Sequence, residues 1–209
     1  YLYGVGGRGS SGLYRISGSS PSALGSTYGL GYYVTVGAGG QIYRSTDGQA
    51  WQSGWEITKH TLKDILYANG VYVASGNKGA VYTSPDGQWW QQVRGEVDRY
   101  GAAAYRDIWT HVIEHQGEIY VLSPEGNHGK SSDGLHWEWF SGVGHNRVIS
   151  DGTYFYFGNG SNLYRSADMQ TVIEKLLPDD TARDILDLAY GDGLFVLRTY
   201  KNSADVLWT

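Results

Sequence analysis

The sequence has no cysteine, and its 209 residues include only 4 prolines and 1 methionine. A chain without cysteine can form no disulfide. No apolar run reaches the roughly 18 residues that a transmembrane helix needs, so membrane insertion is not expected. Charged residues make up only 18% of the chain, the net charge is −5, and like charges form no block. A broad positively charged surface that binds nucleic acid is therefore not expected either.

The residues that are abundant favour strands and tight turns. The chain has 31 glycines, 18 tyrosines and 8 tryptophans, a composition typical of β proteins with many turns. Helical periodicity is not sustained anywhere. The best helix candidate is 181–190, and the repeat described below assigns its second half to a strand.

A short turn followed by an aromatic or apolar strand recurs five times. Asn69-Gly70, Asp151-Gly152 and Asp192-Gly193 are predicted type I′ turns, because glycine accepts the positive φ that such turns require. The glycines at the apex of these turns are spaced 39, 47, 35 and 41 residues apart, and they are Gly31, Gly70, Gly117, Gly152 and Gly193.

A second motif follows each of the first four apices at a constant distance. It reads YRSTDGQAW at 43–51, YTSPDGQWW at 82–90 and KSSDGLHW at 130–137, with a fourth, weaker copy at 166–172. Its aspartates stand 16 residues after their apex glycines (47−31, 86−70, 133−117 and 168−152). A period near 40 with several short strands per unit is typical of a β-propeller.

Each unit is predicted to form four strands. In the best-defined unit these are 64–68, 71–75, 80–84 and about 88–93. The predicted fold is an all-β propeller of about six four-stranded units in a single domain, 1–209, with incomplete terminal units. Closure as five or six blades stays open, as does the interpretation that the chain is a fragment of a longer protein. The approximate units are 1–25, 26–56, 61–93, 105–140, 147–175 and 184–209.

The second motif resembles the Asp-box, or BNR repeat, of sialidase-like propellers, although it is one residue shorter. The matching residues are Ser45, Asp47, Gly48 and Trp51; Ser84, Asp86, Gly87 and Trp90; Ser131, Asp133, Gly134 and Trp137; and, in the fourth copy, Ser166 and Asp168. The resemblance implies that the motif is a structural staple between the third and fourth strands and is not catalytic. Propellers of this style are similar to those of secreted bacterial proteins and of phage tail or fibre proteins.

All the length variation falls in the connections between units, where binding usually resides on a rigid scaffold. The longest connection is 93–107. From it and from neighbouring loops we select residues suited to sugar hydroxyls, carboxylates or aromatic stacking. These candidate ligand-binding residues are Arg94, Asp98, Arg99, Tyr100, Arg106, His128, His145 and Arg147.

Two short motifs match the sequence patterns of cofactor and metal sites. GVGGRG at 4–9 matches a dinucleotide-binding pattern, but a strand and not a helix is expected after it. HVIEH at 111–115 resembles an inverted zinc-protease signature, yet the repeat places it in a strand, where His111 and His115 share a side and Glu114 points away. No cofactor, metal site or catalytic residue is therefore predicted.

The predicted function is non-catalytic recognition of a glycan or of a cell-surface or other protein partner, in an extracellular location, secreted or virion-associated. Two alternatives stay open. One is an assembly or spacer module of a larger protein, with other domains or further copies of the chain as its partners. The other is a sialidase-like glycoside hydrolase, whose arginine signature is missing here.

Overall fold

The computed structural model describes residues 23–94, 108–176, 184–191, 194–201 and 204–208. Within these residues the chain forms five antiparallel sheets, and strands that follow one another in sequence are neighbours in the sheet. The all-β prediction is confirmed. The predicted glycine-rich motif at 4–9 and the first predicted unit before Ala23 lie outside the described residues.

Four of the sheets have four strands and the fifth has three. The first sheet contains β1 (Ala23–Gly29), β2 (Tyr32–Gly37), β3 (Gln41–Ser45) and β4 (Gln52–Glu56). The second contains β5 (Leu62–Ala68), β6 (Val71–Gly76), β7 (Val81–Ser84) and β8 (Gln91–Arg94). The third contains β9 (His111–His115), β10 (Glu118–Leu122), β11 (Asn127–Ser131) and β12 (Glu138–Ser141). The fourth contains β13 (Arg147–Ser150), β14 (Phe155–Asn159), β15 (Asn162–Ser166) and β16 (Val172–Lys175). The fifth contains β17 (Asp184–Gly191), β18 (Leu194–Lys201) and β19 (Ala204–Trp208). Single 3₁₀ turns, η1 (Ala38–Gly40) and η2 (Asn77–Gly79), join the second and third strands of the first two sheets.

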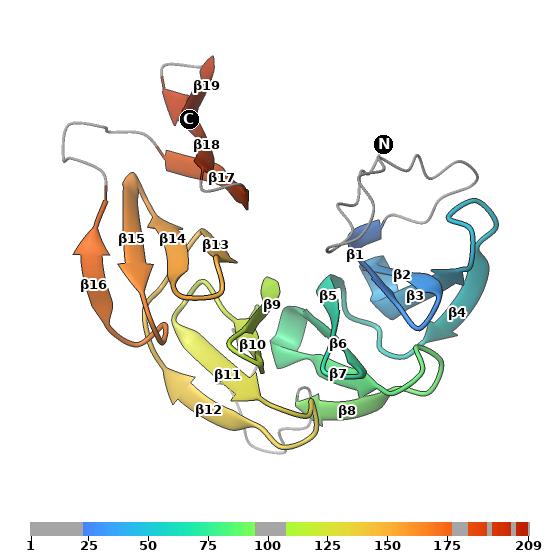
Figure 1. The fold of residues 1–209 in the computed structure, drawn as a ribbon. Helices are drawn as coiled ribbons and strands as arrows, with labels where there is room; N and C mark the ends of the chain where they lie inside the picture. Colours follow the sequence, from blue (N-terminus) through green and yellow to red (C-terminus); the bar gives the residue numbers. More distant parts are fainter. Residues whose placement is uncertain (1–22, 95–107, 177–183, 192–193, 202–203, 209) are drawn as a thin grey trace.

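The sheets follow one another along an arc, with the first strand of each toward the inside and the fourth toward the outside (Figure 1). First strands contact first strands, so that β1 packs beside β5, β5 beside β9, β9 beside β13 and β13 beside β17. The predicted strands of 64–93 correspond to β5–β8, and the second half of 181–190 is a strand, as expected. Four of the five described sheets thus have the four strands that the repeat predicts.

The predicted type I′ turn at Asn69-Gly70 is confirmed, and two apices for which that turn type was not predicted, Leu30-Gly31 and Gln116-Gly117, have the same geometry. Asn69 and Gln116 have φ values of 52° and precede Gly70 and Gly117, which both have φ of 81°; Leu30-Gly31 is alike. These are the two successive positive φ values of a type I′ turn.

The prediction of a two-residue turn at Asp151-Gly152 is wrong. Ser150 pairs with Phe155, which leaves a four-residue loop. Asp151 Oδ1 accepts the backbone N–H groups of Thr153 and Tyr154, both at 2.7 Å, and this Asx-type bonding stabilises the longer loop. Asp192-Gly193 lies outside the described residues.

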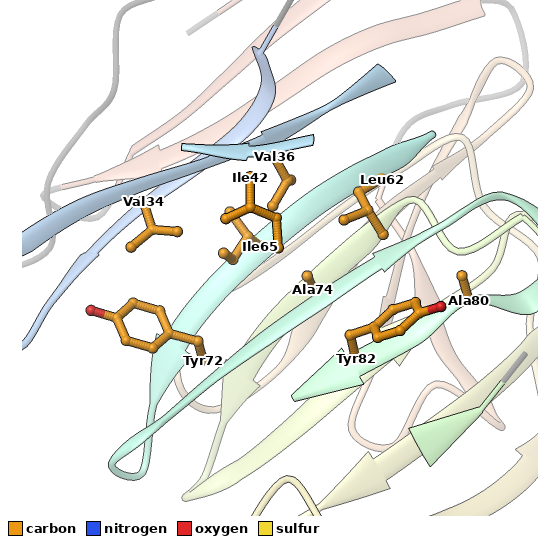
Figure 2. Close-up of a cluster of buried hydrophobic side chains, with 9 residues drawn as sticks. All are labelled: Val34, Val36, Ile42, Leu62, Ile65, Tyr72, Ala74, Ala80 and Tyr82. Carbon is orange, nitrogen blue, oxygen red and sulfur yellow. The ribbon is translucent and has the colours of Figure 1, made fainter. Parts of the chain in front are cut away.

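The hydrophobic core lies between the sheets, in one cluster at each of the four junctions. Figure 2 shows the first cluster, in which Val34 and Ile42 of the first sheet meet Ile65 and Tyr72 of the second. The Tyr72 hydroxyl also donates a hydrogen bond to the carbonyl of Gly29 across this junction. Because the inner sheets are packed on both faces, their strands carry apolar side chains on both faces.

Candidate functional site

The aspartates of the repeated motif use their carboxylates within their own turns. Asp47 Oδ1 accepts the backbone N–H groups two and three residues further along the chain, both at 2.8 Å. Ser45 Oγ accepts the N–H of Gly48 at 2.9 Å, and the Trp51 indole donates to the carbonyl of Gly48 at 3.2 Å. The hydrogen bonds from backbone N–H groups hold the pKa of Asp47 below its ordinary value.

The other three copies repeat the carboxylate and hydroxyl bonds, and the second and third also repeat the indole bond. In the third copy the side chain of His136 bonds Asp133 at 2.7 Å and is the main reason that the pKa of Asp133 is lowered. In the fourth copy Met169 replaces the glycine, with φ of 59° and a fully buried side chain. Carboxylates that are ionised and saturated by their own backbone are unsuited to act as general acids.

A stack of cationic and aromatic side chains marks the start of the long connection between the second and third sheets. Arg94, the last residue of β8, places its guanidinium carbon 4.0 Å from the ring centre of Trp139 and 5.4 Å from that of Trp109. Trp139 in turn stacks on Trp137, with ring centres 5.5 Å apart. Arg94 stands just before the connection and Trp109 stands near its end, so both ends of the connection adjoin this packed stack.

Three histidines gather at the junction of the third and fourth sheets. The ring centre of His145 lies 5.1 Å from that of His111 and 5.9 Å from that of His128. His128 and His145 are each only 1% exposed. His128 Nε2 bonds the carbonyl of Val143 at 3.0 Å, whereas neither ring nitrogen of His145 has a hydrogen-bond partner among the described residues.

Burial keeps this histidine cluster, His111, His128 and His145, uncharged. Desolvation is the main reason that the pKa of His145 is lowered to about 2 and that of His111 to about 4, and the positive charge of Arg147 contributes to both shifts. All three rings are therefore neutral at pH 7. Within the described ranges no group of three histidine, aspartate or glutamate side chains is placed to hold a metal ion.

The structure brings together some of the predicted ligand-binding residues and separates others. The charge of Arg147 acts on His145, but the rings of His128 and His145 are both buried, each only 1% exposed. The side chain of Arg147 is 47% exposed, and its Nε lies 4.0 Å from Asp187 Oδ1. Arg94 belongs to the preceding junction. The remaining candidates, Asp98, Arg99, Tyr100 and Arg106, lie outside the described residues.

The HVIEH motif forms strand β9, as the repeat predicts, and not a helix. His111 faces the histidine cluster, and His115 packs on Phe155 of the fourth sheet with ring centres 4.0 Å apart. Glu114 is exposed and accepts the N–H of Gly117 at 2.7 Å. The geometry of a zinc-protease helix is therefore not formed.

Sequence reasoning missed one half-buried acid, Asp64, at the junction of the second and third sheets. Asp64 accepts the N–H of Ile65 in its own strand at 2.9 Å and that of Val112 in β9 at 2.8 Å. Desolvation raises the pKa of Asp64 to about 6. Asp187 makes the same local bond, to the N–H of Leu188 at 3.0 Å. The available signal was spacing, since each aspartate stands six residues before its apex glycine (70−64 and 193−187).

No protein-family model matches the chain, and no curated protein matches its sequence. Solved structures do match. The chain is similar to YCF48 bound to D1 peptide, with a TM-score of 0.60 and 20% identity over 85% of this chain and 60% of that chain. It is also similar to the WD40 β-propeller domain of Doa1 (TM-score 0.60, 12% identity, 88% of this chain and 63% of that chain). A third match is the computationally designed Ika8 protein (TM-score 0.55, 11% identity, 89% and 70%).

These similarities establish the fold as a β-propeller. The chain spans less than two thirds of the length of the YCF48 and Doa1 chains. Within the described residues no helix is both long enough and apolar enough to cross a membrane.

Proposed function

We propose that this propeller is a non-catalytic binding module that recognises a peptide segment of a partner protein. The observation that carries the proposal is the Arg94–Trp139 stack at the base of the connection 95–110. This connection has 16 residues, whereas 57–61 and 142–146 have five each. Long connections on a rigid scaffold commonly hold binding residues.

Two further points support a peptide ligand. The connection contains the predicted residues Arg99, Tyr100 and Arg106, and arginine and tyrosine are enriched where proteins bind one another. YCF48, a propeller of similar fold, is bound to a peptide in its solved structure.

The test exposes the full chain to a peptide array and to a glycan array. We expect selection of peptides, and at least a tenfold loss of affinity for the best peptide in the variant R99A/Y100A without a change in Tm. The matched control Q52A/K59A changes two exposed residues of the first sheet and its connection, and it keeps the wild-type affinity. Binding on the glycan array alone supports the predicted carbohydrate ligand and overturns the peptide proposal.

An R99A/Y100A variant with unchanged peptide affinity overturns the assignment to this connection. Binding to neither array favours the assembly or spacer alternative. The extracellular location and the resemblance to the Asp-box class stay predictions.

A further inference from the structure

Four of the six histidines of the chain lie at the junction of the third and fourth sheets. One is His111, and the other three are each 2% exposed or less, namely His115, His128 and His145. The remaining two differ, because His60 is half-buried in the connection 57–61 and the side chain of His136 is 89% exposed. Buried histidine is thus concentrated at one junction of the described sheets.

The buried rings contact both sheets but are incompletely hydrogen-bonded. His115 of β9 packs on Phe155 of β14, and its Nδ1 lies 2.8 Å from Ser150 Oγ. The described residues offer no hydrogen-bond partner to Nε2 of His115, to Nδ1 of His128 or to either ring nitrogen of His145. A protonated imidazole has two N–H donors to satisfy. A proton added to His145 would therefore be buried without an acceptor, which is costly.

The charged groups that face His111 and His145 do not compensate for an added proton. Arg147 of β13 faces both rings, and its positive charge disfavours the protonation of each. Asp187 of β17 acts in the opposite direction on His111, but desolvation and Arg147 are the larger influences there. On His145 no carboxylate acts from the described residues, and the other two rings of the histidine cluster disfavour its protonation as well.

The other two histidines of this junction are also held neutral by burial. Desolvation is the largest influence on the pKa of His128 and lowers it, although backbone hydrogen bonding at Val143 and Asn127 opposes the shift. The pKa of His115 is lowered by desolvation too. Three carboxylates oppose that shift without reversing it, and they belong to Glu114, Glu118 and Asp151. All four rings thus disfavour a proton while the sheets are packed.

We propose that the junction of the third and fourth sheets is an acid-operated opening point, where protonation of buried histidines separates these two sheets while the first junction stays packed. This inference does not depend on the proposed binding function. When the sheets separate, the rings reach water and regain pKa values near 6.5, so the open form binds more protons and is favoured as the pH falls.

The neighbouring junction of the second and third sheets responds to acid with the opposite sign. Its titratable group is Asp64, whose pKa desolvation raises to about 6. A carboxyl with a raised pKa takes up its proton more readily in the packed form than in the open form. Acid therefore favours packing at Asp64 and opening at the histidines, which assigns the acid response to one junction.

The expected size of the response follows from the number of rings that stay neutral. Each such histidine increases the ratio of open to closed form about tenfold for each pH unit below 6.5. His111, with a pKa of about 4, and His145, with a pKa of about 2, both stay mainly neutral at pH 4.5 in the closed form. Each should then favour opening by about 100-fold at this pH.

Met169 is a built-in reporter of this opening. It is the only methionine of the chain, and its side chain is fully buried in the core cluster between the third and fourth sheets. Hydrogen peroxide transfers one oxygen atom to the thioether sulfur and is itself reduced to water, which gives methionine sulfoxide. Mass spectrometry of the full chain measures this gain of one oxygen atom at pH 7 and at pH 4.5, relative to N-acetylmethionine amide at the same pH.

We expect Met169 to be oxidised at least 100-fold faster at pH 4.5 than at pH 7, and a smaller acceleration overturns the proposal. The variant L62M/M169L moves the single methionine to a fully buried position at the first junction, and this exchange nearly conserves volume. Its oxidation should accelerate at least tenfold less than that of Met169. Equal acceleration at the two positions would show unfolding of the whole chain and overturn the proposal.

A histidine variant tests the origin of the acid response. In H145F the acceleration of Met169 oxidation should fall about 100-fold, because one proton-binding ring is lost, whereas the control H60F should leave it unchanged. H111F is a second variant with the same expected fall, in case H145F is already open at pH 7. An acceleration that both H145F and H111F retain in full would overturn the role of the histidines.

Discussion

The second and fifth sheets follow the same repeat, yet among the described residues only the second has sheets packed on both of its faces. Val71 and Val73 of the second sheet are 7% and 0% exposed against the third sheet. Their equivalents in the fifth sheet, Leu194 and Val196, are 61% and 40% exposed. The comparison shows that the position in the repeat determines on which face of the sheet a side chain lies. The neighbouring sheet determines whether that face is buried.

Asp64 of the second sheet and Asp187 of the fifth sheet also differ in how far a neighbouring sheet covers them. Asp64 is half-buried and bonds the N–H of Val112 of the next sheet, whereas the side chain of Asp187 is 65% exposed. Oδ2 of Asp187 accepts no hydrogen bond from the described residues. One local structure thus serves as a link between sheets in the second sheet and as a surface carboxylate in the fifth.

The largest expected effect comes from uncovering the second sheet. Trp109 is fully buried against Val71 and Val73, so W109A should lower the free energy of unfolding by about 3–5 kcal/mol. Urea denaturation measures the change. The control W89A alters a side chain that is 72% exposed and should change stability by less than about 0.5 kcal/mol. Equal losses in the two variants would contradict the role of Trp109 as a cover.

The histidine cluster should make the junction of the third and fourth sheets sensitive to acid. The folded-state pKa values of His145 and His111 lie below the ordinary 6.5, so the unfolded chain binds protons first. Their contribution to stability is fully present above pH 6.5 and is lost as the pH falls toward 4. For one histidine that stays neutral, the loss at pH 4 is about 3 kcal/mol.

The variant H145F removes one of these sites and should lose about 3 kcal/mol less than wild type between pH 7 and pH 4. Unfolding by urea at several pH values measures the difference. The control H60F changes a histidine in the connection 57–61, away from the cluster, and should leave the slope unchanged. Identical pH profiles for H145F and wild type would rule out His145 as a source of acid sensitivity.

Replacing Asp64 or Asp187 should have a smaller effect on the free energy of unfolding. D64A leaves two buried N–H groups without their acceptor and should cost about 1–3 kcal/mol, whereas D187A should cost less than about 0.5 kcal/mol. Because the pKa of Asp64 is raised to about 6, its contribution is fully present below the unfolded value near 4 and declines as the pH rises through 6. The cost of D64A should therefore be larger at pH 5 than at pH 8. A cost that grows with pH would contradict this assignment.

The smallest expected effect is the difference in stability between the variants G48A and G134A, which distinguishes backbone strain from contact between sheets. Gly48 and Gly134 have nearly equal φ values, 71° and 73°, so G48A and G134A incur similar strain. A Cβ at Gly134 would lie 2.9 Å from Val71 Cγ1 of the preceding sheet, whereas at Gly48 the nearest atom is 3.9 Å away. G134A should be less stable than G48A by about 1 kcal/mol in thermal unfolding. Equal stability would indicate that Val71 moves aside at no cost.

Spacing alone predicted much of the fold. The constant 16 residues from apex glycine to motif aspartate were sufficient to place β5–β8 correctly. The same reasoning failed at Asp151, because a side chain that binds its own backbone selected a longer loop than the Asn-Gly type pattern suggests. Turn type depends on such local bonds, which the spacing of repeats does not record.

The candidate site was less predictable. His128 was selected as a polar loop residue, yet it stands 11 positions after Gly117, where Ile42, Val81 and Leu163 are buried. The residue at this position of the repeat is buried in the other units, and this was the signal that could have predicted the burial of His128. The connection 95–110 has no counterpart at the same distance from the other apices, so the repeat predicts no structure for it, and it carries half of the predicted ligand-binding residues.

The stacking of first strand on first strand has an evolutionary corollary. Since each sheet meets its neighbours through the same rows, duplicating or deleting one unit of about 40 residues reuses a surface that already fits. A gene of this pattern can change its number of units without inventing a new contact, while each connection diverges on its own.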